Sequence, residues 1–272
     1  MKYCRENKKL NISAFQHPRD LEAVKKITAL PGFKKILSFL SENTVEKSFH
    51  LMNNSSLMKI SPDMSPKIHS MVKEAVDIFD VGEIPDIYID RRYEMLVRLD
   101  GMSKPFIVFS TSVLEQYDDE MLFPLIASEV AGIKAGHATI KFVDSILKIA
   151  KPIIPFAIDI PVTIALNDWY RSKAYTYDRA FLLVSESFEL AAKEILFGEV
   201  SVNVLQTLNL DKPNNTYLEQ AQEFGGRDGA EGLYQKFNTV FSRNQWLASR
   251  YVELYNWYNS GEYQDVLEGS VR

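Results

Sequence analysis

The segment that most constrains this chain covers residues 127–137, Ala-Ser-Glu-Val-Ala-Gly-Ile-Lys-Ala-Gly-His. It lies in a predicted helix that begins after Asp118, because an aspartate at this place accepts hydrogen bonds from the first free backbone amides of a helix. We expect the helix to end near Gly136. A carboxylate, Glu129, therefore stands inside this helix, and the residues around it decide what it can do.

The positions around Glu129 have the spacing of a helical zinc site without its metal ligands. In the pattern H-E-x-x-H, two histidines four residues apart share one helix face and bind zinc. The glutamate between them acts as general base on the zinc-bound water. Ser128 and Gly132 occupy the two histidine positions, and neither residue supplies an imidazole. The sequence therefore predicts no zinc on these residues.

Several motifs in order along the chain resemble the HtpX-like and Ste-type zinc metallopeptidases, whose helix reads H-E-L-G-H-I-K-x-G-H. Gly136 and His137 match its last two residues. Residues 174–180, Ala-Tyr-Thr-Tyr-Asp-Arg-Ala, are similar to the family's E-Y-x-A-D-R-A, and residues 257–263 resemble its closing W-x-x-S-G-E-Y. The resemblance implies a zincin-like fold, in which a small sheet flanks a cleft and the motif helix forms the cleft floor.

The same resemblance assigns roles to individual residues. The family's third zinc ligand is a glutamate, and its position here holds Ala174. Asp178 lies four residues on, hence on the same helix face, and matches an aspartate that supports the site around the ligands in intact members. His137 matches a histidine beyond the ligand pair that is not itself a ligand. Zinc is expected in intact members, but we expect no cofactor here, which leaves Glu129 as a vestigial general base.

Hydrophobic periodicity predicts an α+β fold that is mainly α, with a small antiparallel sheet beside the motif helix. Helices are expected over residues 20–40 (broken at Pro31-Gly32), 64–79, 118–136, 139–150, 168–185, 188–197 and 245–258. Strands are expected over 86–90, 95–99 and 106–110, and loops over 209–215 and 225–232. We expect an N-terminal helical segment, 1–60, followed by a zincin-like domain, 61–272.

Composition limits the partners and the compartment. The chain has 31 basic and 36 acidic residues and no basic tract, which argues against an electrostatic nucleic-acid partner. A single cysteine, Cys4, allows no disulfide framework, and the N-terminus has no apolar signal region, so we expect a cytoplasmic protein. The longest apolar run, 152–166, is shorter than the roughly 20 residues of a membrane span. Contact of residues 139–166 with a membrane surface is an alternative to their burial.

Three functions remain open at this point. The first is an inactive relative of the family, a pseudopeptidase that binds a protein or peptide or serves as a scaffold. Backbone pairing with a sheet edge needs no zinc, so peptide binding can outlast catalysis. The second is an active peptidase with an unconventional metal site, and the third is a peripheral membrane or structural partner protein. Ser128 is a poor nucleophile, because in a continuous helix His137 would lie on the opposite face. The oligomeric state is left open.

Overall fold

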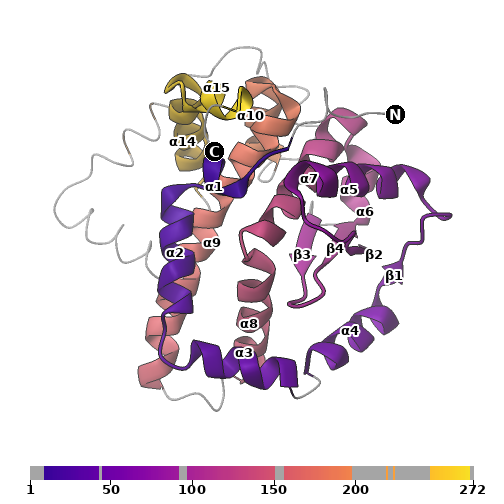
Figure 1. The fold of residues 1–272 in the computed structure, drawn as a ribbon, viewed down its shortest axis with the longest axis vertical. Helices are drawn as coiled ribbons and strands as arrows, with labels where there is room; N and C mark the ends of the chain where they lie inside the picture. The colour runs from indigo at the N-terminus through magenta and orange to yellow at the C-terminus, as the bar shows by residue number, and fades with distance from the viewer. Residues whose placement is uncertain are drawn as a thin grey trace. The chain divides into compact units, whose positions relative to one another are not determined.

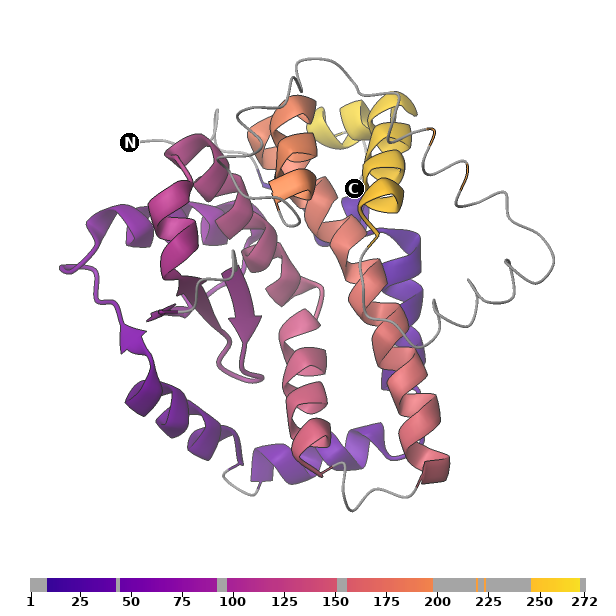
Figure 2. The same cartoon turned by 180° about the vertical axis from the view of Figure 1, so that it is seen from behind.

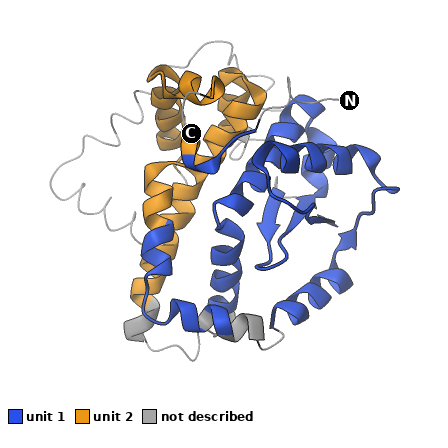
Figure 3. Ribbon diagram, viewed as in Figure 1, with its two compact units in different colours: residues 1–13, 24–154 blue, residues 14–23, 155–272 orange. Residues whose placement is uncertain are grey.

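The computed structural model describes residues 9–42, 45–91, 97–150, 156–197, 219, 223 and 246–269, which fall into two compact units (Figure 3). Unit 1 comprises residues 1–13 and 24–154, and unit 2 comprises residues 14–23 and 155–272. Helices α1 (Ile12–Phe15) and α2 (Pro18–Thr28) contribute residues to both units. The expected division into 1–60 and 61–272 is a different one and stays a prediction.

Unit 1 combines a small sheet with helices, as Figure 1 shows. Its described helices are α3 (Phe33–Glu42), α4 (Val45–Ser56), α5 (Pro66–Phe79), α6 (Thr111–Gln116), α7 (Asp119–Lys134) and α8 (His137–Ala150). Helices α5 and α7 pack against each other, and both α7 and α8 contact strand β3. The α+β class with a mainly α content is therefore confirmed.

The sheet of unit 1 is mixed, with the strand order β1-β2-β4-β3. Its strands are β1 (Met58–Lys59), β2 (Asp86–Asp90), β3 (Val97–Asp100) and β4 (Phe106–Ser110). Strands β3 and β4 form the expected antiparallel pair, but β2 runs parallel to β4. The expectation of a wholly antiparallel sheet is therefore wrong. Strand β4 lies between β2 and β3, whereas the expected order placed β3 between β2 and β4. Strands β2 and β4 both run opposite to β3, so they are parallel to each other.

A tight turn explains why β3 and β4 pair as predicted. Gly101 has a φ of +89°, a backbone conformation that glycine adopts at little cost. A Cβ atom on Gly101 would lie 2.6 Å from the Lys104 carbonyl oxygen, so a side chain there would clash with the turn. All residues of β4 are buried, as expected for a central strand covered on both faces.

The motif helix begins and ends as its sequence predicts. The Asp118 side chain accepts a hydrogen bond of 3.0 Å from the Met121 amide, which caps the first turn of α7. The helix ends at Lys134, and Gly136 takes a φ of +76°. This left-handed residue turns the chain, so that His137 begins the separate helix α8.

Unit 2 is built around one long helix, seen from behind in Figure 2. That helix is α9 (Phe156–Ser185), and the unit also has α10 (Phe188–Phe197), α14 (Leu247–Asn259) and α15 (Glu262–Leu267). Helix α9 contacts α10 and α14. The expected helix start at 168 is wrong, because α9 begins at Phe156 and continues through Pro161. Pro161 is the sixth residue of α9, so the helix continues there without one backbone hydrogen bond.

Other expectations fall partly outside the described residues. Helix α10 has the predicted bounds of 188–197, whereas the predicted loops 209–215 and 225–232 lie outside the described residues. Within the described part of the chain, no helix has the length and apolarity needed to cross a membrane. Contact of residues 139–166 with a membrane surface stays a prediction.

Candidate functional site

The centre of α7 is buried, and its serine bonds within the helix. Ser128 and Glu129 are 3% and 7% exposed, and Gly132 is also buried. The Ser128 hydroxyl donates a 2.8 Å hydrogen bond to the Leu125 carbonyl oxygen one turn earlier in the same helix. Serine commonly satisfies itself in this way inside a helix. Its hydroxyl is therefore engaged by the helix backbone, which argues against a role as nucleophile.

The residues at the positions that the family resemblance predicts as ligands do not fit a zinc ion. Zinc sites in proteins are built from three or four converging nitrogen, sulfur or oxygen ligands. Gly132 and Ala174 have no such side-chain atom, and the Ser128 hydroxyl already bonds to Leu125. No group of three or more histidine, cysteine, aspartate or glutamate side chains that could hold a metal occurs among the residues that the structure describes. We therefore derive no catalytic step through a metal.

His137 lies in a different element from the one that the sequence predicted. We expected it on the far face of a continuous helix, about 13 Å along the axis from Ser128 at 1.5 Å per residue. Instead it is the first residue of α8, beyond the turn at Gly136, and is only 2% exposed. The prediction that Ser128 and His137 lie on opposite faces of one helix is therefore wrong. The reason that Ser128 is a poor nucleophile is instead its hydrogen bond to Leu125.

The other half of the predicted site lies on α9 in unit 2. Ala174 and Asp178 are both buried, one helical turn apart. The Asp178 carboxylate binds the Arg250 guanidinium of α14 through two bonds, of 3.0 Å from Nε and 2.5 Å from Nη2. Two parallel charge-assisted bonds of this kind hold both groups in a fixed orientation. Asp178 is therefore a structural tie between α9 and α14.

A second polar cluster of unit 2 joins the α9 helix to residues 14–23. The Thr176 hydroxyl donates to the Asp20 carboxylate at 2.6 Å and accepts from the His17 amide at 3.1 Å. Asp20 also accepts from the Gln16 side chain at 3.0 Å. Thr176 and Asp20 are fully buried, so these bonds satisfy groups that water cannot reach.

The tautomer of His17 follows from its contacts. Its Nδ1 atom accepts a hydrogen bond from the Arg19 amide at 3.2 Å, which requires that nitrogen to carry no proton. The proton then resides on Nε2, which donates to Glu253 at 3.3 Å. His17 thus caps the start of α2 and connects it to α14, and its ring packs 4.8 Å from that of Tyr175.

Two charged groups in unit 2, Glu253 and Arg179, have pKa values below their usual ones. The hydrogen bond from His17 holds the pKa of Glu253 below its usual value, and the charges of Arg19 and Arg179 act in the same direction. Burial lowers the pKa of Arg179 to about 10. Its guanidinium stacks 4.7 Å from the Trp257 ring and donates to the Phe15 carbonyl oxygen at 3.3 Å. These charged groups are engaged in holding α9, α14 and the N-terminal residues of unit 2 together.

The predicted site residues are thus distributed over two units. Unit 1 contains Ser128, Glu129, Gly132 and His137, and unit 2 contains Ala174 and Asp178. The convergence of the two sets stays a prediction, as do the roles assigned to their members. Sequence reasoning missed the cluster of His17, Asp20, Thr176 and Glu253. The available signal was Pro18, which favours the first position of a helix and so marks the residue before it as the cap.

Comparison with known proteins gives one informative similarity. The chain is 26% identical over 276 aligned positions to plastoglobule-localized metallopeptidase 48, chloroplastic, of Arabidopsis thaliana, covering 97% of this chain and 78% of that protein. This similarity supports a metallopeptidase-like family. No family model matches the chain, and no solved structure matches it. The metallopeptidase-like character accords with the resemblance that the sequence motifs indicated.

Proposed function

We propose that this metallopeptidase-like chain is a catalytically inactive, HtpX-like relative of the zinc metalloendopeptidases that binds a protein or peptide or serves as a scaffold. The observation that carries the proposal is the donor set at the three former ligand positions. Gly132 and Ala174 offer no ligand atom, and the Ser128 hydroxyl is bonded to the Leu125 carbonyl oxygen. A site of this composition cannot hold zinc through the family's residues.

Glu129 alone is insufficient for amide hydrolysis. Metal binding lowers the pKa of water from about 15.7 to about 7 and polarises the scissile carbonyl. Without the metal, a positioned carboxylate contributes roughly 10²–10⁴-fold as a general base. This falls far short of enzymatic rate enhancements, which are typically about 10⁶-fold or more. Loss of the ligands therefore removes catalysis even with Glu129 in place.

Two alternatives draw support from the name of the Arabidopsis relative. That relative is named a metallopeptidase, which favours an active enzyme whose metal would use an unconventional ligand set. It is also named plastoglobule-localized and chloroplastic, which leaves the cytoplasmic location of this chain a prediction and keeps a peripheral membrane role as the third candidate. Co-sedimentation of the full chain with vesicles tests the last of these.

Metal analysis of the purified full chain tests the proposal most directly. We expect no stoichiometric zinc and no cleavage of casein above background, with or without chelator. About one zinc per chain, lost on Glu129→Gln or on substitution of a histidine, would establish the unconventional site. Chelator-sensitive proteolysis by the unmodified chain would refute the inactive assignment.

Restoring the ligands tests the assumed convergence of α7 and α9. The variant Ser128→His, Gly132→His and Ala174→Glu places two histidines and a glutamate at the family's positions. We expect it to bind zinc in a chelator-sensitive manner. A matched variant with Ser128→Asn, Gly132→Asn and Ala174→Gln introduces similar bulk without the same ligands and should bind none. Equal zinc binding by both variants would show that the three positions do not converge.

A further inference from the structure

Four lysines lie on either side of the turn that joins α2 to α3. Lys25 and Lys26 are in the last turn of α2, and Lys34 and Lys35 are in the first turn of α3. All four side chains are exposed, and all belong to unit 1. Residues 23–41 contain no acidic residue, although acidic residues outnumber basic ones by 36 to 31 in the whole chain. We call these four side chains the lysine patch.

Both helices turn their apolar side chains inward and their lysines to solvent. Ile27 of α2 and Phe33 of α3 are 1% and 5% exposed. The turn between them is tight, because Gly32 has a φ of +87° and the Phe33 amide donates to the Leu30 carbonyl oxygen at 3.0 Å. This amphipathic arrangement is typical of helices at a protein surface. Exposure to water alone requires polar residues there but does not require that they all be cationic.

The electrostatics of the helix ends do not account for Lys34 and Lys35. A cation is favourable in the last turn of a helix, where Lys25 and Lys26 lie, and unfavourable in the first turn, whose free amides carry partial positive charge. No acidic residue offsets this charge in the first turn of α3. The lysine patch is therefore a concentration of positive charge that α3 itself does not stabilise.

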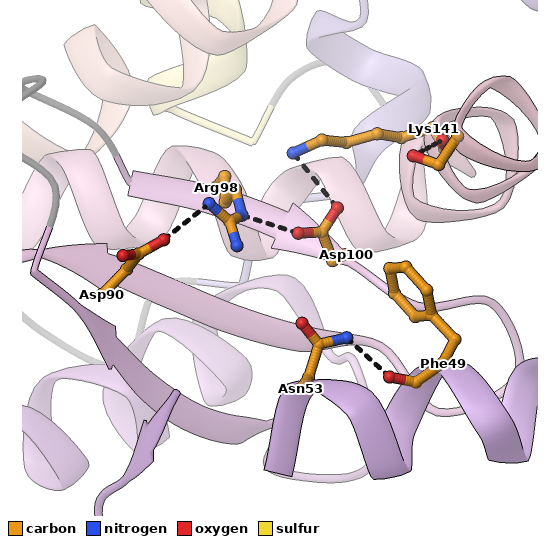
Figure 4. Close-up of polar contacts among 7 residues, drawn as sticks. Phe49, Asn53, Asp90, Arg98, Asp100 and Lys141 are labelled. Carbon is orange, nitrogen blue, oxygen red and sulfur yellow. Dashed lines mark hydrogen bonds and ion pairs between the residues drawn. The ribbon is translucent and has the colours of Figure 1, made fainter. Parts of the chain in front are cut away.

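Several other lysines of unit 1 are neutralised by carboxylates. Those that form ion pairs with an aspartate are Lys59, Lys67, Lys134, Lys141 and Lys148. Figure 4 shows the least exposed example, in which Lys141 lies 3.4 Å from Asp100, and Arg98 bonds to Asp100 at 2.7 Å and to Asp90 at 3.3 Å. Within the described part of the chain, the ion pairs include no partner for Lys25, Lys34 or Lys35. Their charges are therefore available to an external anion.

The next helix adds an exposed apolar pair. Helix α4 packs against α3 and follows it along the lower side of unit 1 in Figure 1. Its residues Leu51 and Met52 are 68% and 67% exposed, the highest values among the large hydrophobic side chains that the structure describes. Phe49 packs on the sheet (Figure 4), and Leu51 follows it by about 200° around the helix, hence on the outer side. Apolar side chains beside lysines are typical of helices that lie on a lipid bilayer.

This combination favours a lipid surface over a nucleic acid. Clusters of roughly four to eight basic side chains on amphipathic helices bind anionic lipid headgroups. Sites for single-stranded nucleic acid instead combine basic side chains with exposed aromatic rings on which bases stack. The exposed side chains next to the lysine patch are aliphatic, and an exposed leucine and methionine gain nothing from a phosphate backbone in water.

We propose that the lysine patch and the Leu51–Met52 pair form a docking surface for an anionic lipid bilayer. The lysines contact the headgroups, and the apolar pair enters the boundary between headgroups and acyl chains. The proposal goes beyond the proposed function and involves none of the predicted ligand positions. The surface lies in unit 1 and is distinct from residues 139–166.

Co-sedimentation of the full chain with vesicles tests the proposal. We expect binding to vesicles of phosphatidylcholine with phosphatidylserine and little binding to phosphatidylcholine alone. Salt should weaken the binding, because the Debye length falls from about 10 Å at 0.1 M to about 3 Å at 1 M. Equal binding to both kinds of vesicle would refute an electrostatic surface.

Paired substitutions locate the surface. Each lysine near an anionic leaflet strengthens binding by about fivefold, so Lys34→Gln with Lys35→Gln should weaken it at least about tenfold. Lys34→Arg with Lys35→Arg keeps the charge and should bind as the parent does. The matched control, Lys67→Gln with Lys73→Gln, changes the net charge equally at two exposed lysines of α5 and should also bind normally.

The apolar pair has its own test. Leu51→Asn with Met52→Asn should weaken vesicle binding several-fold and leave its salt dependence unchanged, because no charge is removed. All substituted side chains are exposed, so the melting temperature of each variant should match that of the parent.

Two outcomes would overturn the proposal. Undiminished vesicle binding by the Lys34→Gln and Lys35→Gln variant would place any lipid contact on another surface. Tighter binding to single-stranded RNA than to anionic vesicles, lost in the same variant, would assign the lysine patch to nucleic acid. None of these readouts depends on zinc or proteolysis, so their failure leaves the inactive-peptidase proposal untouched.

Discussion

The two helices that carry the predicted ligand positions differ in where the hydroxyl and carboxylate groups with known partners are bonded. On α7, Ser128 bonds to a carbonyl three residues earlier. On α9, Thr176 bonds to Asp20, 156 residues away in sequence, and Asp178 bonds to Arg250, 72 residues away. The polar groups of α9 therefore tie distant segments of unit 2 together, whereas Ser128 is satisfied within its own helix.

This difference indicates which polar side chains of the two helices can be replaced at little cost. A hydroxyl that bonds to a carbonyl of its own helix supports no distant segment, so its loss should cost little. A buried ion pair cannot lose one member so easily, because the other charge then remains in a region of low polarity. The contrast predicts large effects of substitution around α9 and a small one at Ser128 of α7.

The largest effect should follow Asp178→Ala. The substitution leaves the Arg250 guanidinium without its bidentate partner, and removal of one member of a buried pair typically costs about 3–5 kcal/mol. The side chains of Asp178 and Arg250 are 4% and 16% exposed, so water compensates little. Urea denaturation of the full chain measures the change in the free energy of unfolding.

A pair on the same helix provides the control for that experiment. Asp168 lies 3.4 Å from Arg171, and its side chain is 45% exposed. Ion pairs with a solvent-exposed carboxylate contribute about 0–1 kcal/mol, so Asp168→Ala should change stability little. Equal decreases in the free energy of unfolding for Asp178→Ala and Asp168→Ala would contradict the conclusion that the buried Asp178 holds α9 and α14 together.

Thr176→Val should have an intermediate effect. Valine keeps the shape of threonine but removes the hydroxyl that donates to Asp20 and accepts from the His17 amide. A buried group that loses its hydrogen-bond partner typically costs about 1–3 kcal/mol. The exposed Thr28, whose hydroxyl bonds to carbonyl oxygens of its own helix, is the matched control. Thermal denaturation measures the change in melting temperature. An equal decrease for Thr28→Val and Thr176→Val would contradict the distinction between local and long-range hydrogen bonds.

Local sequence signals predicted the ends of the motif helix well, whereas contacts between segments far apart in the sequence could not be predicted. Asp118 and Gly136 define the ends of α7 through backbone chemistry that a few adjacent residues determine. The strand order could not be predicted in this way, because the parallel pairing of β2 with β4 depends on which edge β2 joins. Periodicity shows where strands lie but does not identify their neighbours.

The candidate site shows the same limit. The absence of ligand atoms at Gly132 and Ala174 is evident from the sequence, whereas the bonds of Thr176 and His17 connect positions far apart along the chain. The start of α9 was also misplaced, at residue 168 instead of Phe156, because the helix continues through Pro161. His137 was misplaced for a related reason: the chain turns at Gly136 and begins a new helix.

The smallest effect should follow Ser128→Ala. The Ser128 hydroxyl donates to the Leu125 carbonyl oxygen, and because that bond lies within α7 it ties no distant segment to the helix. Alanine also has the higher helix propensity, by up to about 0.5 kcal/mol, which offsets part of the lost hydrogen bond. We therefore expect a change in unfolding free energy of less than about 1 kcal/mol, measured by urea denaturation beside Asp178→Ala. A loss as large as that of Asp178→Ala would show that Ser128 supports more than its own helix, and that the centre of α7 retains a structural role comparable to that of α9.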